Sequence, residues 1–480
     1  MAAHLATRQR PPGPARAARA DRDLDLGVVT ALVPPALVQQ VVAHCGRAER
    51  RSRALPAALM VYFVIGLALF SGQGYREVLR KLTGGAGGYR IATSSALARA
   101  RRRLGPEPLE QIFSRLCAAA TAQQAPPARA FGRQLVLAAM DGTTLNVPDT
   151  TANAAAFGPA PMVGGGRGGG QAGYPQVRLL TVIGCGTRSV LAAAFGARRT
   201  GEHTLARAVS AAGAIGPGMI ILADRGFFGH PLISCFFHLG ADLIWRARAD
   251  QILPRIAEFA DGSYLSVIPE TREGRRHAMA RHRGRPLTRV PHGIPVRVIE
   301  ADITITPAAG PPRTEHYRLI ATLYDTRKAP AAAIARTYAM RWHIETSYRE
   351  LKTCLRDRHP VLRSATPDTI TQEIWALLIA HQIIQVTRTG ACRQAGQDPG
   401  RGSYTVTLRA ITRQITRGTP TRHPRQAAAT EILTGLLPAR GPRSYPRGRK
   451  SSNARRAAIK ETPPGPITCT ITIRPPSPSP

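Results

Sequence analysis

The chain has 480 residues, with 66 lysine and arginine against 29 aspartate and glutamate residues and a formal net charge of +37. An excess of this size indicates a polyanionic partner, usually nucleic acid. The seven scattered cysteines show no zinc-binding spacing and predict reduced thiols rather than disulfides. The first residues lack the apolar core of a signal peptide. The 17-residue apolar run 54–70 contains Pro56 and predicts a buried helix rather than a membrane span.

The N-terminal quarter of the chain has two parts. Residues 1–25 form a basic arm without apolar periodicity, which we expect to be disordered. Residues 26–125 have helical periodicity, and within them YREVLRKLTGGAGGYRIATSSALARARRRLG predicts a helix, a glycine-rich loop and a Ser-capped basic helix, as in a helical DNA-binding domain. The candidate DNA-contacting residues are Arg99, Arg101, Arg102 and Arg103. A packed helix with a solvated arginine face explains the same pattern, and the sequence leaves both interpretations open.

The next segment predicts strands and one helix. Strands are expected at 134–140, 176–186, 189–199 and 218–224, with a helix at 202–213. The first and last of these strands lead directly into Asp141 and Asp224. Ligands bind at strand ends in α/β sheets, although a single aspartate there is more often a helix cap or turn former. The GGGRGGG stretch at 164–170 predicts a flexible loop and not a phosphate cradle.

The second half of the chain alternates between the two types of structure. Residues 243–321 are rich in predicted strands, and helices are expected at 330–356 and 366–388. Residues 396–480 form a basic, proline-rich C-terminal region with only weak helical signals, which we expect to be partly disordered.

One predicted helix gathers polar residues on a single face. Tyr338, Arg341, Glu345 and Lys352 stand at offsets 0, 3, 7 and 14. At about 100° per residue these offsets fall within one narrow stripe. Glu345 alone is more often a solvated helix residue. Together with the two strand-end aspartates, however, it makes a set of carboxylates that can hold two Mg²⁺ ions for phosphoryl transfer. The two cations of the stripe would then meet phosphates, and the tyrosine would hydrogen-bond a phosphate or stack on a base.

This spacing resembles a known signature. Tyr338-x2-Arg341-x3-Glu345-x6-Lys352 is similar to the Y-(2)-R-(3)-E-(6)-K signature of the insertion-sequence-four family of DDE transposases. The stretches MDGTTLNVPDT, ADRGFFGH and TPDTITQEIWALLIAHQ resemble that family too, so the similarity runs from about residue 30 to 390.

The resemblance implies an α/β fold. A ribonuclease-H-like catalytic core would occupy residues 130–242 and 322–395, with a β-strand-rich insertion at 243–321 and an N-terminal helical domain. It also implies the catalytic, metal-holding triad Asp141, Asp224 and Glu345, with two Mg²⁺ (or Mn²⁺) ions as cofactors.

The function implied by the resemblance is cut-and-paste transposition. The partners would be DNA, as terminal inverted repeats and as target, and a second copy of the chain in a synaptic homodimer that forms a hairpin intermediate. The expected place of action is the nucleoid of the bacterial cytoplasm. The alternatives are an inactive or domesticated transposase-derived DNA-binding protein, a simple nuclease on the same fold, and an arginine-driven structural RNA-binding protein.

Overall fold

The computed structural model describes most of the chain. The described residues are 24–51, 53–84, 92–122, 131, 135–159, 162–163, 171–248, 250–270, 273–274, 276, 292–306, 311–356, 359–417, 422–438 and 468–474. The expected glycine-rich loop at 164–170 and nearly all of the expected N-terminal arm lie outside them.

The chain folds into two compact units. Unit 1 comprises residues 1–120, 144–177 and 348–438, and unit 2 comprises residues 121–143, 178–347 and 439–480. Each unit therefore collects segments that are distant in sequence. The domain boundaries expected from the sequence stay predictions.

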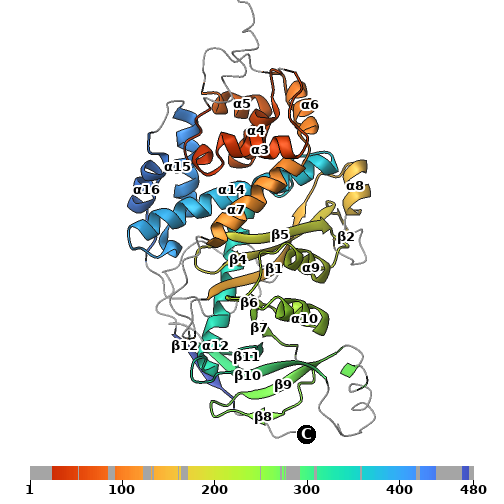
Figure 1. Ribbon diagram of the computed structural model, residues 1–480, viewed down its shortest axis with the longest axis vertical. Coiled ribbons are helices and arrows are strands. Elements are labelled where there is room, and N and C mark those ends of the chain that lie inside the picture. Colours follow the sequence, from red (N-terminus) through yellow and green to blue (C-terminus); the bar gives the residue numbers. More distant parts are fainter. Residues whose placement is uncertain are drawn as a thin grey trace, which may run out of the picture. The chain divides into compact units, whose positions relative to one another are not determined.

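Unit 1 is built from helices (Figure 1). They are α2 (Val28–Leu32), α3 (Pro35–His44), α4 (Ala57–Leu69), α5 (Tyr75–Leu82), α6 (Ser94–Leu104), α7 (Glu107–Ala122), α8 (Thr151–Phe157), α14 (Pro367–Gln394), α15 (Tyr404–Arg417) and α16 (Pro424–Thr434). The long helix α14 packs against α4, α15 and α16. It begins with a capping box formed by Thr366 and Thr369, which satisfies backbone groups at its first turn.

The apolar run at 54–70 forms α4, a helix of 13 residues that is buried along almost its whole length. The sequence-based prediction of a buried helix is therefore confirmed. Within the part of the chain that the structure covers, no helix combines the length and apolarity needed to cross a membrane. All seven cysteines are free.

The second architectural feature is one large mixed sheet (Figure 1). Its strands lie in the order β5-β4-β1-β6-β7-β11-β10-β9-β8, and β12 pairs with β10. Their bounds are β1 (Val136–Asn146), β4 (Gln176–Gly184), β5 (Val190–Ala197), β6 (Met219–Ala223), β7 (Asp242–Arg246), β8 (Ala257–Glu258), β9 (Tyr264–Pro269), β10 (Gly293–Thr306), β11 (Arg313–Ala321) and β12 (Thr468–Ile473). A separate ribbon joins β2 (Met162–Val163) to β3 (Gln171–Ala172).

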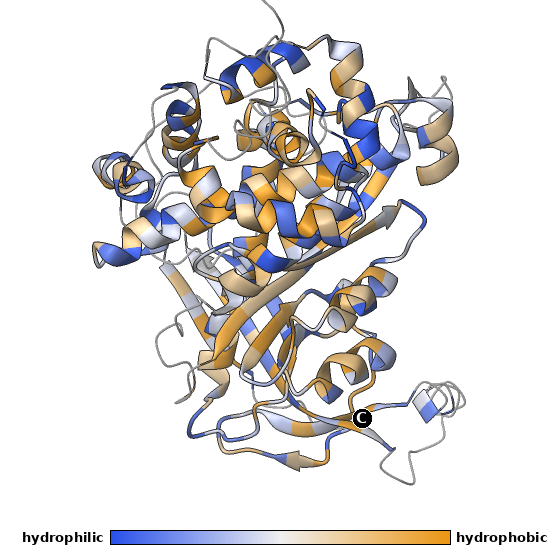
Figure 2. Cartoon of the chain, turned by 45° about the horizontal axis from the view of Figure 1, so that its top comes forward, coloured by the Kyte–Doolittle hydropathy of each residue, from blue (hydrophilic) through white to orange (hydrophobic). Residues whose placement is uncertain are grey.

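Helices α9 (Glu202–Ala211) and α10 (His230–His238) pack against each other and against the sheet (Figure 1). The core between them is apolar, and in Figure 2 the sheet strands are largely orange while many helices have blue outer turns. Strands β1, β6 and β7 run parallel, whereas β11, β10, β9 and β12 continue the sheet in antiparallel pairs. The four strands and the helix expected between residues 134 and 224 are present.

Three expectations need correction. The segment from Tyr338 to Lys352 is not one uniform helix: α12 (Ala331–Tyr338) passes through the 3₁₀ turn η2 (Ala339–Arg341) into α13 (Trp342–Arg349), and η3 (Glu350–Leu355) is π-helical. A constant 100° per residue therefore does not apply along it. The side-chain cap of α6 is Thr93 and not a serine. The strand β12 emerges from a region for which the sequence predicted only weak helices.

Candidate active site

The two aspartates meet because of strand register. Strands β1 and β6 are parallel neighbours, and their last paired residues are Met140 and Ala223. Asp141 and Asp224 follow these residues directly. Since adjacent strands lie about 4.8 Å apart, the two carboxylates stand side by side at one edge of the sheet. Strand β1 continues to Asn146, so Asp141 marks the end of the pairing with β6 and not the end of the strand.

Each aspartate also shapes its own backbone. Oδ1 of Asp141 accepts a hydrogen bond from the Gly142 N–H at 2.8 Å. Oδ1 of Asp224 accepts one from the Arg225 N–H at 2.7 Å, and this aspartate is the N-cap of the 3₁₀ turn that follows β6. These bonds fix the direction of each carboxylate and leave the second oxygen of Asp224 for another ligand.

Arg341 forms ion pairs with both Glu345 and Asp141. Its Nη1 lies 3.8 Å from Asp141 Oδ2, and its Nη2 lies 3.5 Å from Glu345 Oε1 one turn further along. Its side chain is only 16% exposed, against 27% for Asp141 and 31% for Glu345. Arg341 also interacts electrostatically with Asp224, so all three sequence-predicted carboxylates act on one guanidinium.

Tyr338 is buried, and its ring lies near the Arg341 guanidinium. Its ring is 5% exposed, and its hydroxyl donates a hydrogen bond to the Ala223 carbonyl at 3.4 Å, next to Asp224. Its ring meets Tyr317 edge-on at 6.0 Å, and the Arg341 guanidinium lies 6.0 Å from its centroid. The tyrosine thereby ties the 338–349 segment to the end of β6.

Two further contacts hold the segment that carries Glu345. The Cys185 thiol donates to the Met340 carbonyl at 3.5 Å, and the Gly186 N–H donates to His343 Nδ1 at 3.2 Å. Both donors come from the turn after β4. The 3₁₀ turn and the start of α13 are therefore anchored on two sides, to β6 by Tyr338 and to the β4 turn by these bonds.

The pKa shifts at the site combine the effect of burial with that of the neighbouring charges. Burial raises the pKa of Asp141 to about 6, opposed by the Gly142 hydrogen bond and Arg341 and assisted by the charge of Asp224. Burial by itself would lower the pKa of Arg341, but Tyr338, Asp224 and Asp141 outweigh it, and the pKa is raised. One arginine does not neutralise three carboxylates, so the site has capacity for an additional cation.

A fourth carboxylate lies at the site and was missed by the sequence analysis. Glu202, the first residue of α9, adds to the rise of the Asp141 pKa, and a Cβ placed on Gly142 would come within 2.6 Å of its Oε1. The neighbouring His203 Nε2 hydrogen-bonds the Gly226 carbonyl at 2.8 Å, in the turn after Asp224. No local pattern marks these residues, because only the packing of α9 against the sheet brings them here.

The remaining predicted site residues lie in unit 1. Lys352 is half-buried in η3, where burial and then Arg356 lower its pKa. On α6, Arg99, Arg102 and Arg103 are exposed. Arg101 is 1% exposed, and its guanidinium donates to Gln372, to the Tyr75 hydroxyl and to the Thr369 carbonyl. Arg101 therefore links α6 to α5 and α14 inside unit 1.

The donor chemistry of the site fits a divalent metal ion. Asp141, Asp224 and Glu345 offer carboxylate oxygens, which Mg²⁺ and Mn²⁺ prefer. Among the described residues, no three acidic, histidine or cysteine side chains are close enough to ligate one ion together. The guanidinium of Arg341 lies between two of these carboxylates.

Two family models and a curated relative match the chain. Residues 132–383 match the family model described as "Transposase DDE domain", and residues 23–114 match "Insertion element 4 transposase N-terminal". The chain is 26% identical over 426 residues to "Transposase InsG for insertion sequence element IS4" of Escherichia coli (strain K12), covering 86% of this chain and 89% of that protein.

Two other similarities were found. The "Putative transposase InsZ" of Escherichia coli (strain K12) is 25% identical over 251 residues, which cover 52% of this chain and 80% of that protein. The cryo-EM structure of a piggyBac transposase synaptic complex with hairpin DNA gives a TM-score of 0.38 at 10% identity, covering 90% of this chain and 87% of that chain.

The DDE domain match covers more than half of the chain and defines its class as a DDE transposase, an enzyme that cleaves and transfers DNA strands. Within that class the chain belongs to the insertion-sequence-four family. Its activity is transposition of an insertion sequence, and the DDE domain implies the use of a divalent metal ion.

Proposed function

We propose that this chain cuts DNA at the ends of an insertion sequence and joins the freed ends to target DNA, using Asp141, Asp224 and Glu345 as its catalytic carboxylates. The observation that carries the proposal is the β1–β6 register, which sets two aspartates side by side, with Arg341 linking Asp141 to Glu345. Water hydrolyses a phosphodiester at the element end and leaves a 3′-hydroxyl. That hydroxyl attacks a phosphodiester of the target, and one bond breaks as the other forms.

The three carboxylates would hold two Mg²⁺ or Mn²⁺ ions. Such ions polarise the phosphate and activate the attacking oxygen in an in-line displacement. The raised pKa of Asp141 indicates a carboxylate whose charge is not fully compensated by the protein. Glu202 lies beside Asp141 and serves to keep this edge of the sheet acidic.

Arg341 exchanges partners in the proposed reaction. Without substrate its guanidinium neutralises part of the charge on Asp141 and Glu345. With DNA bound it turns its planar donors toward a phosphate, since arginine binds phosphate in a bidentate manner. Tyr338 supports the arginine at its ring face and is itself anchored on Ala223. The tyrosine therefore positions the arginine, and a base or phosphate could reach the tyrosine only after this segment shifts.

We also propose the finer architecture that the family implies. The part of the sheet from β5 to β7, with α9 and α10, would be the ribonuclease-H-like core, and strands β8 to β11 would be the inserted β region. Parallel pairing of β1 with β6 and β7, followed by a change to antiparallel pairing at β11, supports this division.

Recognition of the element ends is assigned to the N-terminal helices, approximately residues 26–125. Arg99, Arg102 and Arg103 are exposed on α6 and are available to DNA, whereas Arg101 is not. Lys352 would contribute a phosphate contact next to the catalytic helix. The active assembly would be a synaptic homodimer at the bacterial nucleoid, in which two chains hold two ends.

The test is a cleavage assay on DNA carrying the element ends. Asp141→Asn, Asp224→Asn and Glu345→Gln keep shape and remove ligand charge, so each should abolish Mg²⁺- or Mn²⁺-dependent cleavage while DNA binding changes little. The matched control is Asp149→Asn, an exposed aspartate after β1, which should cleave normally. A triad variant that cleaves at the wild-type rate would remove that residue from the metal site.

A further inference from the structure

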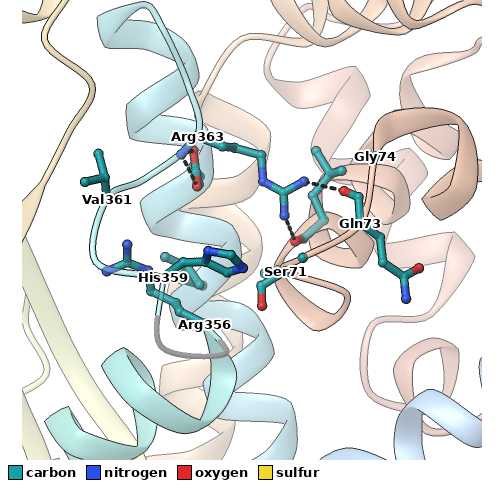
Figure 3. A pocket seen from close by; sticks show the side chains of 12 residues that line it. Ser71, Gln73, Gly74, Arg356, His359, Val361 and Arg363 are labelled. Carbon is teal, nitrogen blue, oxygen red and sulfur yellow. Dashed lines mark hydrogen bonds between the residues drawn. The ribbon is translucent and has the colours of Figure 1, made fainter.

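Unit 1 contains a cavity of about 340 Å³ that is separate from the carboxylate site (Figure 3). Its polar lining consists of Ser71, Gln73, Arg356, His359, Arg363 and Glu373. In Figure 3 Arg356 and His359 lie on one side of it, and Ser71, Gln73 and Gly74 on the other. Cavities that bind small ligands have volumes of about 300–1,000 Å³, so this one suits a small ligand or one group of a larger molecule.

Two of the charged lining residues are already engaged. The Arg363 guanidinium donates to the Gln73 and Leu67 carbonyls, both at 2.9 Å (Figure 3). It thereby links the segment before α14 to the end of α4 and the loop that follows it. Both oxygens of Glu373 accept hydrogen bonds from the Arg363 and Ser364 backbone, and Oε2 also accepts from the Ser364 hydroxyl at 2.5 Å. This arginine and this carboxylate therefore build the wall of the cavity.

Arg356 is different. It is 5% exposed, and its Nη2 is buried without a hydrogen-bond partner among the residues that the structure describes. Among the described residues no carboxylate forms an ion pair with it, although Glu373 acts on it from a longer distance. Burial lowers its pKa, yet a guanidinium stays charged in proteins. A buried cation with an unpaired donor is unfavourable unless a ligand completes it.

The surroundings of Arg356 favour an anion. Lys352 is close enough for Arg356 to lower its pKa, so a second cation lies near Arg356. Gly74 lines the cavity and is the N-cap of α5, whose first turn receives no side-chain cap. Free N–H groups at a helix start attract negative charge. The Gln73 Oε1 is also buried without a partner among the described residues, and a half-turn of this amide would present two further donors.

The mouth of the cavity is accessible. Gly72, Gly74 and His359 are exposed. A Cβ on Gly72 would lie 3.6 Å from His359 Nε2, so this histidine stands over the glycine at the entrance. A tetrahedral oxyanion entering here would find the histidine ring and the Ser71 hydroxyl before reaching the arginine.

We propose that this cavity binds a phosphate group, with Arg356 as its principal donor and Ser71 and His359 at its entrance. In the working enzyme the phosphate belongs to the backbone of bound DNA, and this part of the inference rests on the proposed function. Inorganic phosphate carries the same chemistry and serves as the probe. The site would fix the path of DNA across unit 1 and is distinct from the carboxylates of the reaction.

The first experiment measures thermal unfolding of the full-length chain in sodium phosphate and in sodium chloride of equal ionic strength. Phosphate should raise the midpoint of the wild-type chain above the chloride value, because a ligand that binds only the folded state stabilises it. Arg356→Gln should lose this phosphate-specific rise, as expected for at least a tenfold loss of affinity. Arg413→Gln, which removes the same charge from an exposed arginine of unit 1 paired with Glu431, should keep it.

A second variant avoids dependence on a buried residue. His359→Gln changes an exposed side chain and should fold normally while weakening phosphate binding several-fold. A phosphate-specific rise of wild-type size in both Arg356→Gln and His359→Gln would overturn the proposal. If Arg356→Gln fails to fold, the result for His359→Gln decides.

The second experiment separates the two sources of phosphate. The logarithm of DNA affinity should fall less steeply with the logarithm of salt concentration in Arg356→Gln than in Arg413→Gln, by about 0.9 for one lost contact. An unchanged slope together with a lost phosphate-specific rise would leave free phosphate as the ligand and overturn the DNA assignment. Asp141→Asn should abolish cleavage without altering the phosphate-specific rise, so failure of the catalytic proposal and failure of this one give different results.

Discussion

The carboxylate site of unit 2 and the cavity of unit 1 have opposite imbalances of charge. In the first, three carboxylates share the single guanidinium of Arg341, and the pKa of Asp141 rises to about 6. In the second, Arg356 is buried with an Nη2 that has no hydrogen-bond partner among the described residues, while the Glu373 carboxylate accepts hydrogen bonds from the Arg363 and Ser364 backbone. The first site lacks cations and the second lacks an anion. Metal ions and DNA phosphate are the partners that would complete them.

Two other buried arginines have hydrogen-bond partners for all of their guanidinium nitrogens. Arg297 is fully buried, pairs with Asp261 and donates to Ser263 and to two backbone carbonyls. Arg101 has a partner for each of its three nitrogens. Burial of arginine is therefore ordinary in this chain when the guanidinium is satisfied. The contrast distinguishes Arg101 and Arg297 from Arg356, whose Nη2 has no hydrogen-bond partner among the described residues.

The largest expected effect comes from removing the shared cation of the carboxylate site. Arg341→Met should lower the single-turnover cleavage rate by about a hundredfold, because loss of one preorganised donor to a transition state costs that much. Arg336→Met, an exposed arginine on α12, is the matched control and should cleave normally. A rate for Arg341→Met within threefold of wild type would mean that this arginine does not meet the reacting phosphate.

The next effect tests a satisfied arginine. Arg101→Met should lower the free energy of unfolding by about 2–4 kcal/mol, since it leaves the Gln372 amide oxygen and the Thr369 carbonyl without their donor. Arg102→Met, its exposed neighbour, should stay within about 0.5 kcal/mol. Chemical denaturation of the three proteins provides the comparison. Equal stability of both variants would contradict the internal role of Arg101.

A pH dependence should reveal the acidic site directly. The pKa of Asp141 is about 6 in the folded chain against a usual value of 3.8, so the folded state holds the proton more tightly. Its ionisation therefore costs stability as pH rises from about 4 to 6, by about 1–3 kcal/mol in metal-free buffer. Asp141→Asn should lack this loss and be the more stable protein at pH 7. Parallel stability curves for the two proteins would refute the shift.

The smallest effect concerns a single cation of unit 1. Lys352→Gln should reduce the salt dependence of DNA binding by one phosphate contact, about 0.9 in the slope, with little change in stability. Lys328→Gln, an exposed lysine paired with Asp325, is its control. If both variants have the same slope as wild type, Lys352 contacts no phosphate.

The elements that carry Asp141 and Asp224 could be predicted from the sequence. The apolar runs before Asp141 and Asp224 form β1 and β6, and the expected helix at 202–213 is α9. These elements follow from local hydrophobic periodicity, which depends on near neighbours only. Their order, with Glu345 on a later helix, is the order that the family resemblance implies. Whether each of these residues carries its assigned role stays a prediction.

Other features could not be read locally. The alternating Cys469, Ile471 and Ile473 lie in a basic, proline-rich region, and their strand β12 exists only because β10 has an edge to pair with. The segment from Tyr338 to Lys352 is interrupted by the 3₁₀ turn η2, where it is hydrogen-bonded to Ala223 and to the turn after β4. Such contacts join residues more than a hundred positions apart, and no window of sequence contains both partners.

The sequence by itself determined most of the strands and helices, the order of the three carboxylates and the basic charge, because these depend on composition and short-range pattern. Tertiary structure decided which of the four arginines between residues 99 and 103 on α6 turns inward, since Arg101 finds its partners on α5 and α14. It also set Asp141 beside Asp224 through strand register, and it buried Arg356 Nη2 where no described residue accepts a hydrogen bond from it. The physical reason is the same each time: the environment of a charge is set by residues that only folding brings near.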